Sequence, residues 1–232
     1  MAQLNKEIET ELISQGAKLV RFVDISRLSE SQNRQFPNAI VFALPLTEKY
    51  IKEVFDTPNY VQARVEDNFN FADDEYILTE HKAGWLADHI AKCLTQKGYK
   101  TFSQSDESLI AEGKFDVEHK QSLLPNKTVA MLGGLGWIGK NNLLITREYG
   151  AAQCLGTLLT NAPFATILHE PILPKCGKCS VCVNICEKQV LKNRTWASTI
   201  SRDEIVDVYG CSTCSKCIVH CPVTQLYMKK NL

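Results

Sequence analysis

Closely spaced cysteines constrain this chain more than any other feature of its sequence. Eight of its ten cysteines fall in the C-terminal quarter, in two sets that each read C-x2-C-x2-C-x3-C. Each member of the first set recurs 35 positions later in the second. The eight residues are Cys176, Cys179, Cys182, Cys186, Cys211, Cys214, Cys217 and Cys221. Such a segment can fold only as a small module that depends on metal ligation or on disulfides.

The spacing predicts two 4Fe–4S clusters. Three thiolates of one tight loop bind one cluster, and the fourth cysteine of that set binds the cluster of the other set. This cross-ligation assigns Cys176, Cys179, Cys182 and Cys221 to cluster 1, and Cys186, Cys211, Cys214 and Cys217 to cluster 2. Structural zinc more often uses two C-x2-C knuckles separated by a longer spacer, and a disulfide scaffold would require export. We therefore favour the clusters.

The residue after the fourth cysteine differs between the two sets. Bacterial ferredoxins usually carry proline there. The second set keeps it as Pro222, whereas the first set has Glu187. We expect the chain to leave the first cluster differently from the second.

Apolar patterning predicts an α/β domain over residues 1–168 and a ferredoxin-like domain over residues 169–232, with a polar turn at 171–175 between them. Residues 47–75 show weak periodicity and are interpreted as a lid or loop. The remaining expected elements are a helix around Leu4–Leu12, strands at 18–24, 38–44, 99–102, 142–146 and 151–159, and a long helix at 75–97.

Composition narrows the class of protein. Lys and Arg balance Asp and Glu at 26 each, so the chain lacks the basic excess typical of nucleic-acid binding. No apolar run approaches the roughly 20 residues that span a bilayer. The opening residues do not follow the basic-then-apolar order of a secretory signal. We expect a cytoplasmic protein without membrane contact.

A glycine-rich segment precedes the cysteines and superficially matches two nucleotide-binding motifs. Gly134-x-Gly136-x-x-Gly139 fits the dinucleotide fingerprint, and Lys140 after Gly139 approaches a P-loop. The fingerprint requires a following helix, yet a strand is expected almost at once, and Asn141 replaces the Ser or Thr that binds magnesium. Both motifs are therefore rejected. The glycines instead predict close backbone approach to a ligand or to the cysteine module.

The same segment carries a resemblance to a known family. Gly134-Leu-Gly-Trp-Ile-Gly-Lys-Asn141, followed by a Leu-Leu-Ile strand and the double cysteine module, resembles epoxyqueuosine reductase, a family related to cobalamin-dependent reductive dehalogenases. The resemblance implies a nitroreductase-like domain that binds cobalamin against the ferredoxin-like domain. FMN is the alternative, because nitroreductase-like folds commonly bind it. The implied cofactor-binding residues are Gly133, Gly134, Leu135, Gly136, Trp137, Gly139, Lys140 and Asn141; for Trp137, a core position is the alternative.

The chain departs from this family in two respects. We interpret it as a short form that lacks the C-terminal helical-repeat domain with which the family holds tRNA. The family's proposed proton donor, an Asp in an Asp-Thr-x-Pro-type segment, has no counterpart between Phe115 and Lys127. Asp116 and His119 are weak replacement candidates that more often would be ordinary surface residues. We therefore expect that tRNA is not a partner.

Two functional hypotheses follow. In the first, the protein is an iron–sulfur oxidoreductase that passes low-potential electrons through two 4Fe–4S clusters to a bound cobalamin, which reduces an unidentified substrate. In the second, it is a non-catalytic electron carrier or reductive activator of a partner, such as a corrinoid protein. Both require a low-potential electron donor such as ferredoxin or flavodoxin.

Overall fold

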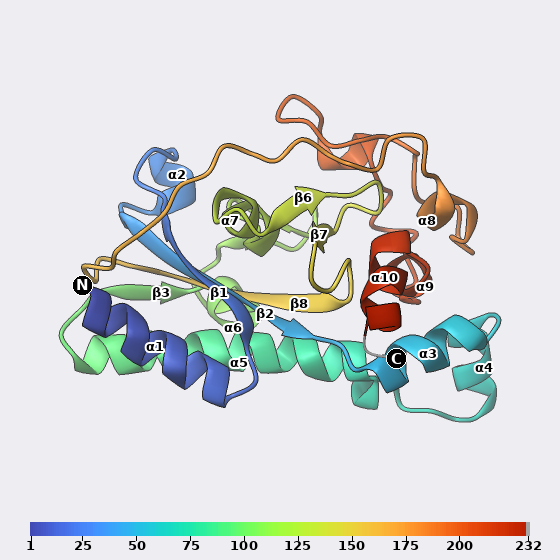
Figure 1. The fold of residues 1–232 in the computed structure, drawn as a ribbon, viewed down its shortest axis with the longest axis horizontal. Coiled ribbons are helices and arrows are strands. Elements are labelled where there is room, and N and C mark those ends of the chain that lie inside the picture. The colour runs from blue at the N-terminus through green and yellow to red at the C-terminus, as the bar shows by residue number, and fades with distance from the viewer. Residues whose placement is uncertain (231–232) are drawn as a thin grey trace. The chain divides into compact units, whose positions relative to one another are not determined.

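The computed structural model describes residues 1–230 and has the mixed α/β architecture that the sequence predicts (Figure 1). Its main sheet has four strands in the order β1-β2-β8-β3, and two short hairpins pair β4 with β5 and β6 with β7. The strands are β1 (Lys18–Asp24), β2 (Asn38–Pro45), β3 (Thr101–Ser103), β4 (Phe115–Asp116), β5 (Gln121–Ser122), β6 (Gly136–Ile138), β7 (Leu144–Thr146) and β8 (Gln153–Thr160).

Helices occupy most of the remaining regular structure. The α-helices are α1 (Ala2–Ser14), α2 (Glu30–Asn33), α3 (Glu48–Asp56), α4 (Tyr60–Glu66), α5 (Glu75–Gln96), α6 (Asp106–Ala111), α7 (Asn126–Leu132), α8 (Val181–Asn184), α9 (Lys216–Val219) and α10 (Pro222–Lys230). Two 3-10 helices add η1 (Phe71–Asp73) and η2 (Arg202–Glu204). Within the described residues, none of these helices is both long and apolar enough to cross a membrane.

The chain divides into two compact units. The first contains residues 1–44, 79–135 and 154–171, and the second contains residues 45–78, 136–153 and 172–232. The expected domain boundary at residues 168 and 169 therefore lies close to one of several crossings between the units. The cysteine segment shares its unit with two segments from earlier in the chain.

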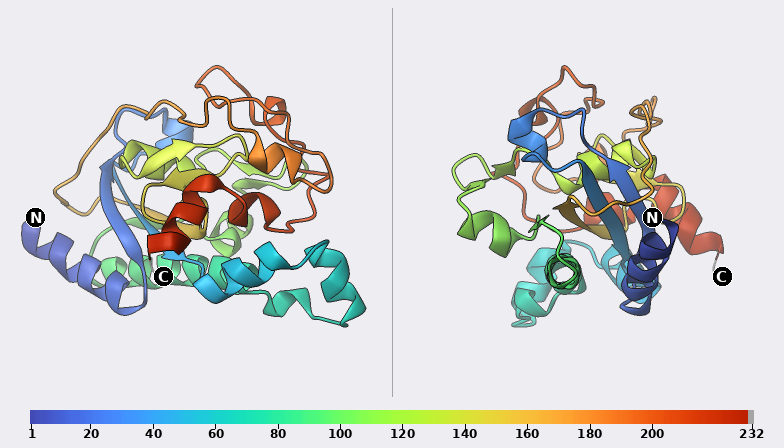
Figure 2. Two further views of the ribbon diagram at one scale, coloured as in Figure 1. Left: turned by 45° about the vertical axis from the view of Figure 1, so that its right-hand side comes forward. Right: turned by 90° about the vertical axis from the view of Figure 1, so that its left-hand side faces the viewer.

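The main sheet forms the centre of the first unit. Strands β1 and β2 pair antiparallel, with Arg21 opposite Val41, and β3 and β8 pair antiparallel as well. Helix α5 lies on the same side of the sheet as α1. The right-hand view of Figure 2 looks along the axis of α5. Close packing at this face depends on Gly156 of β8, because a Cβ there would lie 2.2 Å from the Phe42 ring.

Helix α5 confirms the predicted long helix with one difference. Leu86, Ile90 and Leu94 form its buried face, as the sequence pattern indicates. The neighbouring Trp85 lies outside this face, because it is 54% exposed and stacks on His89. An indole ring stacked on imidazole at the surface satisfies the i, i+4 spacing without entering the core.

The prediction of a lid or loop over residues 47–75 was wrong. This segment forms α3, α4 and η1 in the second unit. The Thr47 hydroxyl caps α3 by accepting a hydrogen bond from the Tyr50 amide at 3.2 Å. Tyr50, Ile51 and Val54 then form a buried face. These positions have the i, i+1, i+4 spacing of one helical face, so the sequence carried a helical signal that the interpretation as a loop overlooked.

Candidate functional site

Four cysteines of the second unit surround one cavity. The cavity has a volume of about 170 Å³, and Cys186, Cys211, Cys214 and Cys217 all line it. Apolar side chains of Val190, Leu191, Val206 and Ile218 complete much of the wall. These four cysteines are the set that cross-ligation assigns to cluster 2. The fold therefore brings Cys186 of the first motif to the three leading cysteines of the second.

The other four cysteines also lie close to one another. Desolvation raises the pKa of Cys182 to about 11, and the next largest causes are the negative charges of Cys176, Cys221 and Cys179. These are the remaining members of the predicted cluster 1 set. An electrostatic effect of this kind requires short separations, so Cys221 of the second motif approaches the leading cysteines of the first.

The cysteine thiols line a cavity and are not arranged as ligands of a single metal ion within the described residues. All ten cysteines are free thiols. Across residues 1–230, no group of three or more His, Cys, Asp or Glu side chains is drawn together as for a single ion. Desolvation also raises the pKa of Cys217, followed by the charges of Cys214, Cys182, Cys211 and Cys186. Closely spaced thiolates at this site would therefore repel one another unless a positively charged metal core bound them.

The two motifs leave their sites differently, as the Glu187 and Pro222 positions predict. Cys221 directly precedes α10, where Pro222 occupies the first helical position. The backbone N–H groups of Thr224 and Val223 lower the pKa of Cys221 against the larger effect of desolvation. After Cys186 the chain forms a turn and then a bridge between Leu191 and Val206.

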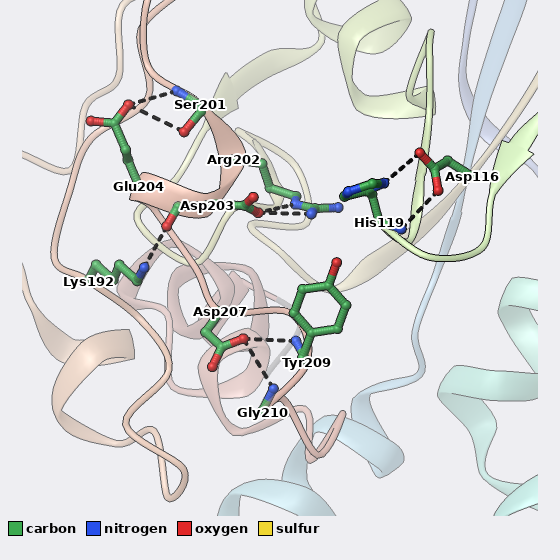
Figure 3. A network of polar contacts seen from close by, with 10 residues as sticks. All are labelled: Asp116, His119, Lys192, Ser201, Arg202, Asp203, Glu204, Asp207, Tyr209 and Gly210. Carbon is green, nitrogen blue, oxygen red and sulfur yellow. Dashed lines mark hydrogen bonds and ion pairs between the residues drawn. The ribbon is translucent and has the colours of Figure 1, made fainter.

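Local hydrogen bonds order the loop between the two motifs (Figure 3). The Lys192 Nζ donates to the Asp203 carbonyl at 2.6 Å, and Glu204 closes a capping box with Ser201. The Asp207 carboxylate accepts from the Gly210 amide at 3.3 Å, immediately before Cys211. These contacts fix the path of the chain into the second motif.

A buried lysine joins the second motif to α3. Lys216, between Cys214 and Cys217, is only 4% exposed. Its Nζ donates to the Val54 carbonyl at 2.7 Å and to the Thr57 carbonyl, at the C-terminal end of α3. A cation is favourable there because the last carbonyls of a helix lack partners. Desolvation lowers the pKa of Lys216, and the charges of Glu187 and Cys214 oppose that effect.

A buried network of tyrosines lies behind the same cavity. Tyr50 donates to Asp74 at 2.8 Å and also contacts Ser215 at 3.2 Å, and Tyr60 donates to the second Asp74 oxygen at 2.9 Å. The Tyr76 amide donates to Asp74 at 2.9 Å, so this carboxylate also caps the start of α5. Ser215 and Tyr76 both line the cavity. The network therefore supports the wall of the cluster 2 site.

At two positions of the glycine segment, Gly136 and Gly139, the β6–β7 hairpin leaves no room for a side chain. A Cβ at Gly136 would lie 2.0 Å from the Ile145 carbonyl oxygen of the facing strand. A Cβ at Gly139 would lie 2.9 Å from the Ile145 side chain. Neither alternative left open by the sequence, a ligand or the cysteine module, is needed at these two glycines, because packing within the hairpin itself explains both positions. The β6–β7 hairpin also accounts for the missing helix that excludes a dinucleotide fingerprint.

Gly133 and Gly134, the other two glycines of the segment, pack closely against residues of the first unit. Gly134 has a φ of +70°, and a Cβ there would meet the His169 ring at 2.7 Å. Gly133 packs on Val23 and Arg21, and Leu135 is buried. Left-handed backbone and close contact together explain the glycine at position 134.

Lys140 and Asn141 direct their polar groups to the cysteine module. Lys140 Nζ donates to Asn193 Oδ1 at 3.0 Å, and Asn141 Nδ2 donates to the Cys217 carbonyl at 3.3 Å. Both residues are buried, and Asn141 lines the cluster 2 cavity. Trp137 differs, because its Nε1 is buried without a hydrogen-bond partner among the described residues. The Lys175 ammonium lies 5.7 Å from the centre of its ring.

Asp116 and His119 form an exposed pair in the first unit. The His119 amide donates to Asp116 at 2.9 Å, and the His119 Nδ1 lies 2.8 Å from the other carboxylate oxygen (Figure 3). The hydrogen bonds from His119, backbone first, lower the pKa of Asp116. A lowered pKa reduces the protonated fraction at neutral pH, which is unfavourable for a proton donor.

Sequence reasoning missed Lys216, Ser215 and the Asp74 network. One signal was present: the 35-residue repeat places Lys216 opposite Val181, just as it places Lys178 of the first motif opposite Thr213, so the two motifs carry their lysines at different positions. The partners of Asp74 gave no signal, because they become neighbours only after residues 47–75 fold as helices.

Comparisons with known proteins give a consistent resemblance. No family model matches the chain. An epoxyqueuosine reductase of Bacillus anthracis is 31% identical over 132 residues, which cover 48% of this chain and 34% of that protein. The alignment thus spans about a third of the curated relative. It confirms the resemblance to epoxyqueuosine reductases that the glycine and cysteine motifs predict.

Solved structures share the fold at low identity. A reductive dehalogenase whose structure suggests a mechanism for B12-dependent dehalogenation has a TM-score of 0.65 at 14% identity, over 95% of this chain and 33% of that one. An epoxyqueuosine reductase bound to an epoxyqueuosine-modified tRNA-Tyr stem loop has a TM-score of 0.56 at 16% identity, over 97% and 66%. Because a protein of this fold is seen with tRNA, this complex bears against our expectation that tRNA is excluded, which we withdraw. The chain is thus similar to epoxyqueuosine reductases in sequence, and it shares its fold with them and with reductive dehalogenases.

Proposed function

We propose that the protein is an iron–sulfur oxidoreductase that carries low-potential electrons on two 4Fe–4S clusters, with a corrinoid as its further cofactor. One observation supports the clusters above all: Cys186 lines the same cavity as Cys211, Cys214 and Cys217. A cavity ringed by four soft thiol ligands, with an apolar wall, fits the donor set of a 4Fe–4S cluster. Nitroreductase-like and ferredoxin-like domains, split near residue 168, are part of the proposal.

The chain's own residues perform three tasks at this site. The cysteines hold the clusters, which supply one-electron transfer when bound. Backbone N–H groups at Val223 and Thr224 favour the thiolate form of Cys221. Val190, Leu191 and Val206 give the cluster 2 cavity an apolar wall, which strengthens electrostatic interactions beside it. Free thiols of this kind require a reducing compartment such as the cytoplasm.

Ligand variants test the clusters and the cross-ligation together. Anaerobically prepared protein should contain about eight iron and eight sulfide per chain. Cys186→Ala and Cys214→Ala should remove the same electron paramagnetic resonance signal, and Cys182→Ala and Cys221→Ala should remove the other. Cys93→Ser is the matched control, because Cys93 lies on α5 outside both motifs and should keep the full iron content. Stoichiometric zinc without visible absorbance would contradict the proposal.

Trp137 supports the corrinoid part of the proposal. Its buried indole N–H has no partner in the described residues, and a buried donor is usually satisfied. A corrinoid carries amide oxygens that could accept this hydrogen bond, and it supplies a redox-active cobalt centre when bound. The neighbouring Gly136 and Gly139 do not add support, because the hairpin itself requires them.

Cofactor retention tests this part without measuring activity. We expect the reconstituted protein to retain cobalamin, and Trp137→Phe to weaken retention because it removes only the N–H. Trp85→Phe is the control, since Trp85 is exposed on α5. Retention of FMN in place of cobalamin would identify the alternative cofactor. Retention of neither by cluster-loaded wild-type protein would favour the electron carrier or reductive activator.

The electron donor and the substrate follow from the same proposal. We expect a low-potential donor such as ferredoxin or flavodoxin. Because a structural neighbour binds an epoxyqueuosine-modified tRNA stem loop, that RNA is a substrate to test by single-turnover reduction with a strong chemical reductant. A small molecule or a partner corrinoid protein is the other substrate class.

A further inference from the structure

The two cysteine sites differ in one buried charge. The 35-residue repeat aligns Cys179-Ser180-Val181-Cys182 with Cys214-Ser215-Lys216-Cys217. At the third position the first motif has Val181, which is exposed, and the second has Lys216, which is buried. Ligand types and spacing are otherwise equal, so this position is a point at which the two sites can acquire different redox properties.

Neutral groups hold the Lys216 ammonium in place, while the negative charges of Glu187, Cys214 and Asp56 also act on it. Its two hydrogen-bond acceptors are the carbonyl oxygens of Val54 and Thr57, which are neutral groups. No ion pair of Lys216 is found among the described residues, and the acidic Glu187 is exposed to solvent. With 4% of its surface accessible, the side chain is shielded from screening by salt. A buried charge therefore acts at longer range than a surface charge.

The position of Lys216 directs this effect to cluster 2. It lies between Cys214 and Cys217, two of the cysteines that line the cluster 2 cavity, and Ser215 lines that cavity as well. Asp74, a buried carboxylate of the same unit, has its charge shared among the hydroxyls of Tyr50 and Tyr60 and the Tyr76 amide. The hydrogen-bond partners of Lys216 are instead the two carbonyls at the C-terminal end of α3.

We propose that Lys216 is a redox-tuning residue that raises the reduction potential of cluster 2 above that of cluster 1. This inference rests on the proposed clusters. Reduction adds one negative charge to a cluster, and a nearby buried cation stabilises that state. One electron then passes from reduced cluster 1, which is oxidised, to cluster 2, which is reduced, with no bond made or broken. Cluster 2 is thus the electron-accepting end of the pair.

Neutral variants of the full-length, cluster-loaded protein test the proposal. Lys216→Gln keeps a donor for the Val54 and Thr57 carbonyls, and Lys216→Met keeps the length of the side chain in case the glutamine variant does not load both clusters. Lys216→Arg keeps the charge. Lys178→Gln is the matched control, because Lys178 lies between Cys176 and Cys179 but is exposed. The readout is a potentiometric titration of the two clusters by electron paramagnetic resonance.

We expect the higher of the two midpoint potentials to fall in both neutral variants. The expected change is at least tenfold in the equilibrium constant for reduction, which for one electron is about 59 mV. The lower midpoint should move less, Lys216→Arg should resemble the wild type, and Lys178→Gln should show a smaller shift than Lys216→Gln.

Other outcomes separate this inference from the proposed function. Three results would overturn the tuning role while leaving the clusters intact. The midpoint potentials could stay unchanged in a fully loaded neutral variant, or the lower midpoint alone could move. Lys216→Arg and Lys216→Gln could also shift the midpoints equally. Wild-type protein without iron would overturn the clusters themselves, and the tuning role with them.

Discussion

Removal of the Asp74 carboxylate should destabilise the second unit because three groups lose their acceptor. Tyr50, Tyr60 and the Tyr76 amide all donate to Asp74. A buried hydroxyl left without a partner costs about 1–3 kcal/mol, and a lost helix cap costs about 1 kcal/mol. Because Tyr50 keeps Ser215 as a partner, the loss amounts to one unpaired hydroxyl and one helix cap, so Asp74→Ala should lower the free energy of unfolding by about 2–4 kcal/mol. The whole domain is typically stable by roughly 5–15 kcal/mol.

The two tyrosines should contribute unequally to this loss. Tyr50 still has Ser215 at 3.2 Å after the substitution, whereas Asp74 is the hydrogen-bond acceptor found for the Tyr60 hydroxyl. Adding Tyr60→Phe to Asp74→Ala should therefore recover more stability than adding Tyr50→Phe, because phenylalanine removes the unpaired hydroxyl. In the wild-type background, both Phe substitutions should instead destabilise.

Urea unfolding of cluster-loaded protein under argon measures these differences. Circular dichroism reports the helices and visible absorbance reports the clusters, and both should shift together if Asp74 supports the cluster 2 wall. The reasoning is refuted if the variant carrying Asp74→Ala with both Phe substitutions is no more stable than Asp74→Ala alone. That result would mean that the carboxylate acts through something other than its tyrosine partners.

Three further predictions follow from particular contacts. Gly150→Ala should displace α10 and weaken cluster 1, measured as loss of half the iron, because φ is +61° and a Cβ there would lie 2.3 Å from the Thr224 amide nitrogen. Asp106→Asn should raise the melting temperature at neutral pH, because desolvation first and Glu107 second raise the Asp106 pKa. Above its folded-state pKa, the ionised Asp106 carboxylate lowers the stability of the folded protein. The stabilisation by Asp106→Asn should therefore shrink as the pH falls through that pKa, and a stabilisation that grows in acid would contradict this reasoning. Removal of iron by a chelator should abolish the circular dichroism of α8, α9 and α10, because ligation contributes folding energy; an unchanged spectrum would refute it.

Patterns that depend on local spacing predicted most of the first unit. Strand β1 was predicted at its observed bounds, and β2 and α5 within a residue, because an apolar run or a regular buried face determines each. The cross-ligated assignment of the cysteines stays a prediction, supported by the cavity that Cys186 shares with Cys211, Cys214 and Cys217 and by the mutual charges of the other four thiols.

Features that depend on distant partners could not be predicted. Lys216 was an unremarkable charge in the sequence, and only the folding of α3 provides its carbonyl acceptors. The glycines suggested a ligand or contact with the cysteine module, whereas Gly136 packs on Ile145 of its own hairpin. Short helices such as α4 contain too few buried positions to produce a periodic signal.

The composition of the second unit has a consequence for biosynthesis. Lys216 of its cysteine segment contacts residues 45–78. Two further hydrogen bonds join this segment to residues 136–153: Asn141 donates to the Cys217 carbonyl, and the Ala151 amide donates to the Thr224 hydroxyl. The C-terminal segment expressed alone would therefore lack the groups that order its cysteine loops. During translation, the ligands of both clusters are all present only after Cys221 has emerged, and their supports are by then already made. Insertion of the proposed clusters would consequently follow the synthesis of residues 1–221, whose free thiols would need protection from oxidation until then.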